Sequence, residues 1–378
     1  MALKKSIDKK GITMSTFEVT IEQITVFPHP DADRLELARV GLYNVVVGKD
    51  SYQTGDWVLY IPEYAVLPQE LISTLGLEGK LAGTHNDRVK PIKLRGALSQ
   101  GLVAPLSVIP SGVKLDLPDY AEILGITKYQ PAIPTSMSGD VEGNTELINW
   151  IDIENLKKFP DTFTTDDVVA ISEKIHGSAT LTTFIFDGKN FSTPLETIVS
   201  SKGLGEKQIA LKESESVIYW RTIKENKLAE MASKIAETIS KQEVPVVKVA
   251  IFGEVYGSKV QDLHYGKTNG QLGFSVFDVY VEFANKQGRW LNPAEVDTFG
   301  QLTNVLIVPT LYVGNYDLDT VIGLASGKET ISGEELHIRE GVVIRLYDRP
   351  AGYRAGSERI AKYVSDDYLT RKGGTEYN

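Results

Sequence analysis

Residues 168–186 have the sequence VVAISEKIHGSATLTTFIF, and this stretch decides the fold of the second half of the chain. Two apolar runs, 168–173 and 179–186, flank the segment KIHGS, in which Gly177 marks a tight turn. The pattern predicts two neighbouring strands, with Lys174 at the end of the first. A ligand phosphate can approach the backbone closely at such a glycine turn. Taken alone, K-x-x-G fits an ordinary solvated lysine equally well.

Five further motifs follow this lysine in a fixed order and weaken that simple interpretation. They are SKGLG at 201–205, FGEVYG at 252–257, FSVFDV at 274–279, REGVVIR at 339–345 and RIAKY at 359–363. Each places a lysine, a carboxylate or an aromatic ring in or beside a predicted strand. Cations neutralise phosphate, carboxylates hold a metal ion or a ribose hydroxyl, and an aromatic ring stacks on a base. The set indicates a phosphoryl-transfer site.

Composition excludes several other kinds of site. The 378 residues include no cysteine and only five histidines, which excludes disulfides, cysteine nucleophiles and thiolate zinc sites. Any metal is therefore expected to be a hard cation held by oxygen ligands. The net charge of −10 opposes a surface covered in basic residues. No signal peptide or membrane-spanning run is found, so we expect a soluble cytoplasmic or nuclear protein without a membrane partner.

The chain is expected to form an α+β protein with two domains. Residues 1–14 are interpreted as a tag or mobile tail, and residues 15–110, with short strands broken by turns, as a small β-barrel. The segment 111–148 is rich in Pro, Gly and Ser and is predicted to be a linker. Residues 149–378 are predicted to form the larger domain. Within it, apolar residues at helical spacing predict one long helix over 214–242.

The motif series over residues 150–378 resembles the covalent nucleotidyltransferases, which include DNA ligases, RNA ligases and mRNA-capping enzymes. The segment EKIHGS is most similar to RNA ligases, because His176 stands where related enzymes often carry an acid. The last family motif commonly has two lysines, and here Lys362 matches one while Val364 occupies the place of the other. The resemblance implies a nucleotidyltransferase domain of antiparallel sheets with flanking helices.

The N-terminal region has a resemblance of its own. HPDADRLELARV at 29–40 and KLRGALSQGLV at 93–103 look like the tRNA-binding type of OB-fold. An OB-fold β-barrel that precedes the nucleotidyltransferase domain is similar to a two-domain family of RNA ligases. That likeness implies RNA repair, in which ATP drives the joining of RNA 3′-OH and 5′-phosphate ends at nicks in duplexes, with no obligate protein partner.

The resemblance also implies roles for the charged residues. Lys174 would attack ATP as a neutral amine and carry AMP, although a free lysine with a pKa near ~10.4 is almost fully protonated at neutral pH. Lys362 would bind the α-phosphate. Glu340 would hold Mg²⁺ or Mn²⁺, and Glu254 would bind the ribose or the metal. Lys202 is expected to contact phosphates.

The remaining expectations concern the base and the RNA. Phe277 is expected to stack on adenine, because Phe274, three residues earlier on the strand, faces the other side. Glu173 and the backbone at Gly177 are expected to contact the nucleotide. Arg345 is expected to contact phosphate or nucleic acid. Arg34 and His29, in the turn of the OB-fold, are expected either to contact RNA or to stabilise that turn.

Two alternative functions remain at this point. A capping guanylyltransferase would use the same lysine with GTP, but it would carry its OB domain at the C-terminal end. A non-catalytic RNA-binding protein would need only the OB-fold and would not explain the motif series. Labelling with ATP or with GTP distinguishes the three possibilities.

Overall fold

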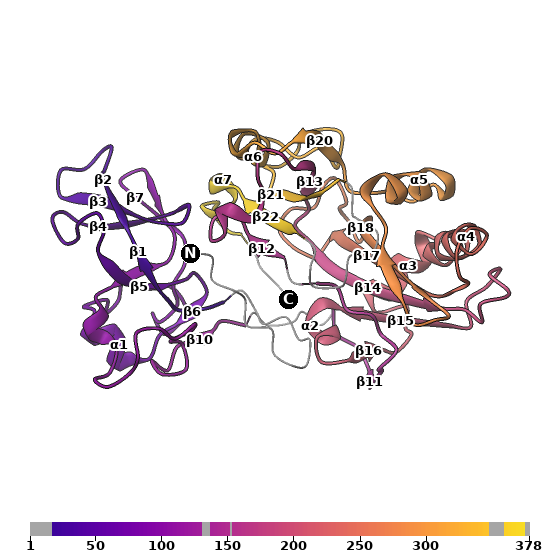
Figure 1. Cartoon of the computed structure of the whole chain (residues 1–378), viewed down its shortest axis with the longest axis horizontal. Coiled ribbons are helices and arrows are strands. Elements are labelled where there is room, and N and C mark those ends of the chain that lie inside the picture. The colour runs from indigo at the N-terminus through magenta and orange to yellow at the C-terminus, as the bar shows by residue number, and fades with distance from the viewer. Residues whose placement is uncertain (1–16, 131–136, 152, 348–358, 375–378) are drawn as a thin grey trace. The chain divides into compact units, whose positions relative to one another are not determined.

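The structure is a computed structural model that describes residues 17–130, 137–151, 153–347 and 359–374 (Figure 1). The tail expected at residues 1–14 lies outside the described residues. The chain forms two compact units. The first comprises residues 1–130, 154–162 and 369–371, and the second comprises residues 131–153, 163–368 and 372–378.

The first unit consists almost entirely of short strands. Its sheets have the strand orders β1-β5-β9, β2-β3-β4, β7-β8 and β10-β6. The bounds are β1 Thr20–Gln23, β2 Thr25–Pro28, β3 Leu35–Val40, β4 Tyr43–Gly48, β5 Trp57–Ile61, β6 Ala65–Val66, α1 Gln69–Thr74, β7 Ile92–Leu94, β8 Ala97–Ser99, β9 Leu102–Ala104, a 3₁₀ turn Leu106–Val108, β10 Thr127–Lys128, β12 Glu154–Asn155 and a 3₁₀ turn Pro160–Thr162.

Strand β5 organises this unit because both of its faces are buried. Val58 and Tyr60 belong to one apolar cluster, while Leu59 and Ile61 belong to another. Successive side chains of a strand point to opposite faces, so alternating apolar residues place β5 between the two clusters. The expected short strands are thus confirmed. Helix α1 has only six residues, because Tyr64, at a φ of 68°, and Pro68 interrupt the chain before it.

Residues 154–162 return to the first unit after the chain has entered the second. Lys157 is 2% exposed, and its Nζ donates to Gln100 Oε1 at 2.9 Å. The Leu42 amide donates to the Lys157 carbonyl at 2.6 Å. Gly41 has a φ of 56°, and a Cβ added there would lie 2.5 Å from the same carbonyl oxygen. Only glycine fits this turn, which holds the returning segment against β3 and β4.

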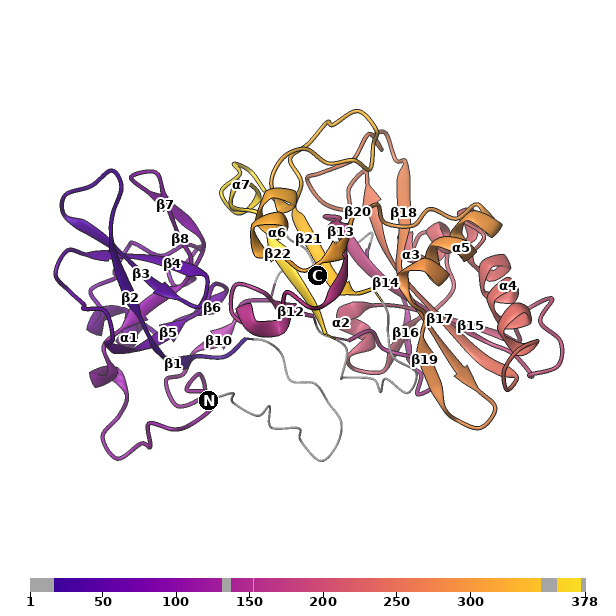
Figure 2. The same cartoon turned by 45° about the horizontal axis from the view of Figure 1, so that its top comes forward.

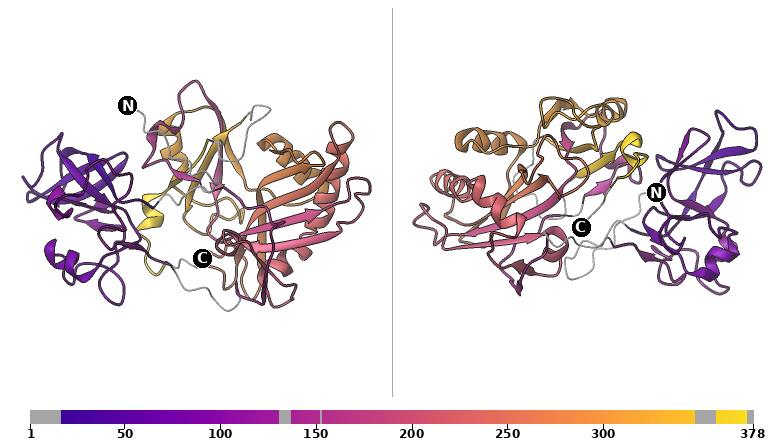
Figure 3. Two further views of the ribbon diagram at one scale, coloured as in Figure 1. Left: turned by 60° about the horizontal axis from the view of Figure 1, so that its bottom comes forward. Right: turned by 180° about the vertical axis from the view of Figure 1, so that it is seen from behind.

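The second unit contains a large antiparallel sheet with the strand order β11-β16-β15-β14-β17-β18-β19. The elements of this sheet and of the helices beside it are β11 Val141–Gly143, β14 Ser178–Ile185, β15 Glu196–Ser201, α2 Lys202–Gly205, β16 Ile209–Leu211, α3 Ile218–Glu225, α4 Leu228–Ser240, β17 Val246–Gly257, β18 Leu272–Phe283, β19 Gly288–Trp290 and α5 Pro293–Thr303. Figure 3 shows α3, α4 and α5 packed on one side of the strands.

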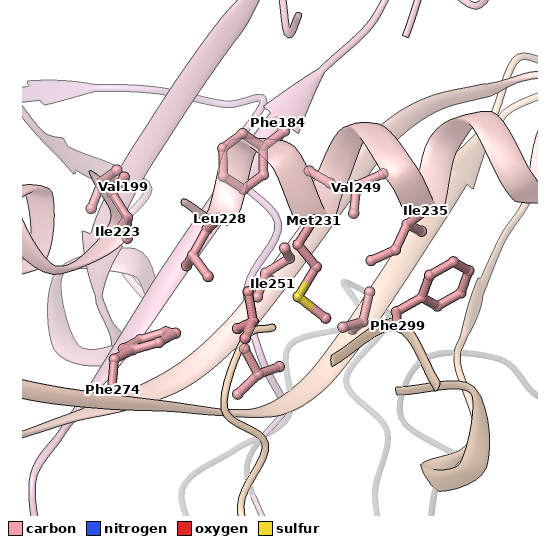
Figure 4. Packing of buried hydrophobic residues seen from close by; sticks show 14 of the residues in the cluster. Phe184, Val199, Ile223, Leu228, Met231, Ile235, Val249, Ile251, Phe274 and Phe299 are labelled. Carbon is pink, nitrogen blue, oxygen red and sulfur yellow. The ribbon is translucent and has the colours of Figure 1, made fainter. Parts of the chain in front are cut away.

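The helical face of the sheet holds the main core. Leu228, Met231 and Ile235 of α4 meet Val249 and Ile251 of β17, and all five are fully buried (Figure 4). Burial of apolar side chains is worth roughly 25 cal/mol per Å² removed from water, so this layer stabilises the unit strongly. None of the helices in the described ranges is long and apolar enough to cross a membrane.

The single helix predicted over 214–242 is wrong, because the chain forms two helices there. Helix α3 ends at Glu225, and α4 begins at Leu228. Between them Lys227 has a φ of 53°, in the left-handed region, and the Asn226 side chain donates to the Thr222 carbonyl. The apolar spacing continues across the break because both helices cover the same sheet, so periodicity alone does not reveal it.

The linker expected at 111–148 is largely built into the two units. Tyr120 and Ile126 are buried in the first unit, at 0% and 4% exposure. Residues 141–143 form β11, which pairs with β16 in the second unit. Residues 131–136 lie outside the described residues. Pro and Gly mark turns in this stretch, but its apolar residues still pack in the two units.

A second sheet contains, in this order, the strands β22-β21-β13-β20 (Figure 2). Its elements and the helices beside it are β13 Val168–Lys174, β20 Thr310–Asn315, α6 Leu318–Ala325, β21 Gly341–Leu346, β22 Ile360–Val364 and α7 Asp366–Leu369. Strand β13 ends at Lys174 and the chain enters β14 of the large sheet four residues later. The KIHGS turn therefore connects the two sheets.

Candidate active site

Lys174 lies beside Glu340. Its Nζ is 2.7 Å from Glu340 Oε1, and the two side chains are 24% and 8% exposed. Lys174 pairs with Gly341 in the register of β13 and β21, so Glu340 immediately precedes the paired position. A Cβ on Gly341 would lie 2.1 Å from the Tyr363 carbonyl, so only glycine allows β21 and β22 to approach there. The strand register thus brings together two residues that are far apart in the sequence.

Glu340 also offers a second oxygen. Glu340 Oε2 is buried and has no hydrogen-bond partner among the described residues. A buried carboxylate oxygen without a partner is costly, which suits a site completed by a bound cation or hydroxyl group. Within the described ranges no group of three or more His, Asp or Glu side chains could hold a metal ion. A cation at Glu340 could take phosphate and water as further ligands, as Mg²⁺ commonly does.

Glu254 lies next to the same turn. Its Oε1 accepts from the Gly177 amide at 3.1 Å. A Cβ on Gly177 would be 2.1 Å from the Val255 carbonyl oxygen and 2.9 Å from Glu254 Cγ, so the turn requires glycine. Burial, helped by the charge of Glu340, raises the pKa of Glu254 to about 8, although Lys174 and Lys202 lower it. These four charged groups therefore share one electrostatic environment.

Lys362 faces the same side of its sheet as Lys174. Lys362 pairs with Val343, which pairs with Ser172, and Lys174 is two residues beyond Ser172. Directly paired residues and residues two apart share a face of an antiparallel sheet. Val364, at the place of the missing family lysine, pairs with Gly341 in the row of Lys174. The sheet therefore presents one lysine of the pair together with the nucleophile candidate.

Phe277 sits at a β-bulge on the other sheet. Phe252 pairs with Asp278 and Gly253 pairs with Val276, so Phe277 is the extra residue in β18. A bulge re-aims a side chain and is frequent beside active sites. Phe274 lies in the helical core at 1% exposure, whereas Phe277 packs against a separate cluster on the sheet. The predicted difference between the two phenylalanines is thus confirmed.

Two of the expected contact residues have buried side chains. Arg345 is 5% exposed, and its Nη1 donates to the Phe277 carbonyl at 2.7 Å. Its contact with phosphate or nucleic acid stays a prediction. The Glu173 side chain is also buried and accepts from Thr330 Oγ1 at 2.7 Å. It faces away from Lys174, since adjacent strand residues point to opposite sides. A role for its backbone stays a prediction.

His176 has partners that the sequence did not reveal. Its Nε2 is 2.9 Å from Asp262 Oδ1, its Nδ1 is 2.8 Å from the Tyr368 hydroxyl, and its amide donates to the Tyr265 hydroxyl at 2.8 Å. The side chain is 5% exposed. His176 therefore fixes the turn after Lys174 to two other parts of the second unit, the segment between β17 and β18 and helix α7.

In the first unit, His29 and Arg34 differ in their surroundings. His29 is 7% exposed, and its Nε2 is 3.0 Å from the Leu94 carbonyl while its Nδ1 accepts from the Asp31 amide. His29 thus stabilises the turn, which was one of its two expected roles. Arg34 is exposed and its contact with RNA stays a prediction.

The fold and the lysine–carboxylate cluster define a nucleotidyltransferase of the ligase class. The RNA ligase family profile matches residues 167–364, more than half of the chain, and an OB-fold domain profile matches residues 18–106. The chain belongs to the RNA ligase family. The α+β fold with its N-terminal OB-fold is thereby confirmed.

Solved structures of a Naegleria gruberi RNA ligase have the same fold. The form with PPi is 22% identical, with a TM-score of 0.72 over 94% of this chain and 98% of that one. A mutant with AMP and Mn has a TM-score of 0.72 at 22% identity, over 93% and 97% of the two chains. A mutant with ATP and Mn has a TM-score of 0.71 at 22% identity, over 93% and 98%. No curated protein matches the chain.

Proposed function

We propose that the chain is an ATP-dependent RNA ligase that joins a 3′-OH end to a 5′-phosphate end, at nicks in RNA duplexes, through AMP bound covalently to Lys174. The observation that carries this proposal is the 2.7 Å contact between Lys174 Nζ and Glu340 Oε1, within the segment that matches the RNA ligase family. ATP and Mn in the structures of the Naegleria enzyme support the choice of nucleotide and metal.

The first chemical step is the transfer of AMP to Lys174. The neutral amine attacks the α-phosphorus, a P–N bond forms, and the bond to the β-phosphate breaks so that pyrophosphate leaves. The amine loses one proton in the process. Lys362 stabilises negative charge on the phosphate, since it shares a face with Lys174. Glu254 orients the nucleotide or the ligands of the metal from the other side of the turn.

Glu340 would hold the divalent cation, through its unpartnered Oε2. When bound, Mg²⁺ or Mn²⁺ supplies charge neutralisation at the phosphates. If Glu340 held this cation, its carboxylate would stabilise the ammonium form of Lys174 less, and the neutral amine that the attack requires would be favoured.

Two further transfers complete the reaction. An oxygen of the RNA 5′-phosphate attacks the phosphorus of the bound AMP, the P–N bond breaks, and Lys174 regains a proton. The 3′-OH then attacks the 5′-phosphorus of the adenylylated end and releases AMP as the phosphodiester forms. Each step depends on positioning and charge stabilisation, as is general for phosphoryl transfer. The OB-fold unit binds the RNA backbone during these steps.

Incubation with α-labelled ATP or GTP and Mg²⁺ or Mn²⁺, followed by a denaturing gel, tests the proposal. ATP alone should label the protein, and the label should chase into a nicked RNA duplex as it is sealed. Labelling by GTP would favour a capping-type guanylyltransferase. No covalent label from either nucleotide, with a folded protein and both metals, would leave a non-catalytic binding function.

A further inference from the structure

Trp150 is held on the sheet face that lies opposite the helices, in a segment that the RNA ligase profile does not cover. The Ile148 amide donates to Thr183 Oγ1 of β14 at 3.0 Å. Leu147 is buried in a cluster with Leu181 and Phe252, both from the large sheet. These contacts fix the segment leading to Trp150, so the position of its ring is set by the fold.

The indole is anchored at its polar edge. Trp150 Nε1 donates to Asp278 Oδ2 at 3.1 Å, and Asp278 is fully buried. Asp278 also lies 3.6 Å from Arg345 Nη1, which itself donates to the Phe277 carbonyl. Residues from three segments thus hold the two rings in place. A buried hydrogen bond of this kind, to a charged group, resists rotation of the ring.

Trp150 and Phe277 form an aromatic corner. Their ring centroids are 4.7 Å apart and their planes meet at 58°, which is neither a parallel stack nor a core sandwich. Both rings remain partly exposed, although they pack on an apolar cluster. A tilted, half-exposed pair leaves ring surface available to a flat ligand such as a nucleobase.

The corner is next to the charged cluster around Lys174. Lys202 Nζ lies 5.6 Å from the centroid of the Trp150 ring. The same lysine acts electrostatically on Glu254, together with Lys174 and Glu340. Cations suited to phosphate and aromatic surface suited to a base therefore occur side by side, in the arrangement that a nucleotide requires.

We propose that Trp150 binds the base of ATP and forms, with Phe277, the wall of the nucleotide site. This inference rests on the proposed function, because it takes ATP as the ligand. Asp278 and Arg345 act as positioning residues that hold the two rings. Bases stack favourably on aromatic side chains, so removal of the indole should weaken ATP binding roughly tenfold.

Tryptophan fluorescence gives a direct test. The chain has four tryptophans, and their surroundings differ. Trp220 and Trp290 are buried, at 7% and 5% exposure, and Trp57 belongs to the other unit. Titration with α,β-methylene ATP, whose carbon bridge prevents AMP transfer, should quench the emission of the parent protein. Trp150→Phe should remove most of that quenching, whereas the control Trp57→Phe should retain it.

Calorimetry with two ligands separates the base from the phosphates. Trp150→Ala should raise the Kd for α,β-methylene ATP about tenfold and leave the Kd for inorganic tripolyphosphate unchanged. Equal losses for both ligands would show that Trp150 only supports the site, and unchanged quenching and affinity would also overturn the proposal. A parent protein that forms no AMP adduct would instead refute the proposed function, so the two failures are distinguishable.

Discussion

At the scale of single residues, the pair formed by Lys174 and Glu340 links catalysis to stability. Lys174→Ala should abolish the AMP adduct, and Lys174→Arg should do the same because guanidinium is never neutral at workable pH. Lys174→Ala also leaves the 8% exposed carboxylate of Glu340 without its cation, which should lower the unfolding free energy by about 1–3 kcal/mol.

Glu340→Gln added to Lys174→Ala should restore that stability without restoring the adduct. Urea unfolding and the labelling gel measure the two effects separately. Residual adduct well above background in Lys174→Ala would show that another residue is the nucleophile. Equal stability of the single and double variants would show that the pair contributes little to the fold.

The raised pKa of Glu254 predicts that the stability of the protein falls as the pH rises. Its pKa is raised to about 8 in the folded protein, so the folded state binds the proton more tightly than the unfolded state. Its contribution to stability is therefore complete below the unfolded pKa and is lost as the pH rises through about 8. Glu254→Gln should flatten the fall of Tm between the unfolded pKa of 4.5 and about 8 and should weaken ATP binding. An equally steep fall in this variant would assign the pH dependence to other groups.

Single residues differ in how far the sequence predicted them. The order of the motifs pointed to Lys174, Glu340 and Glu254, because each lies in a short motif with recognisable neighbours. Trp150 was not predicted, since its partner Asp278 is 128 residues away in the sequence and no local motif includes Trp150. The burial of Arg345 was not predicted, because nothing local shows that β21 places it against the Phe277 carbonyl of β18.

At the scale of elements, a glycine in the break between α3 and α4 should increase the stability of the protein. Lys227 has a φ of 53°, which costs an L-residue roughly 1–2 kcal/mol, whereas glycine adopts this conformation readily. Lys227→Gly should raise the unfolding free energy by about 0.5–1 kcal/mol. Lys227→Ala, which also removes the side chain, is the matched control and should give no gain. Chemical denaturation that ranks alanine above glycine would contradict the explanation.

Strands were predicted better than the helix for a physical reason. A strand such as β17 is bounded by turn residues and carries β-branched residues, both of which are local signals. The bulge at Phe277 and the break at Lys227 are decided by contacts with other elements, and the apolar spacing continues through both.

At the scale of the whole molecule, the OB-fold unit and the nucleotidyltransferase unit should respond differently to salt. Binding of RNA phosphates releases counterions and weakens steeply as salt rises, whereas AMP transfer to Lys174 requires no RNA. Sealing of a nicked duplex should therefore fall more steeply than adduct formation between low and physiological salt. Parallel salt dependences would indicate that backbone contacts do not limit sealing.

Arg34→Ala tests the OB-fold unit through one exposed side chain, whereas deletion of residues 1–110 would remove most of the first unit. That deletion would expose the apolar residues of 111–130 and the segment 154–162, both of which pack in the first unit. A loss of sealing after this deletion would combine the loss of RNA contacts with misfolding of the exposed segments.

The return of residues 154–162 to the first unit makes the chain suitable for division into two complementing fragments. A protein cut before residue 131 would leave the second fragment with a built-in peptide that docks into the first, through buried Lys157 and the glycine turn at Gly41. Residues 1–130 and 131–378, produced as separate chains, should therefore copurify without any fused association tag. Lys157→Glu in the second fragment should abolish the association, and two fragments that never associate would show that docking needs the intact chain.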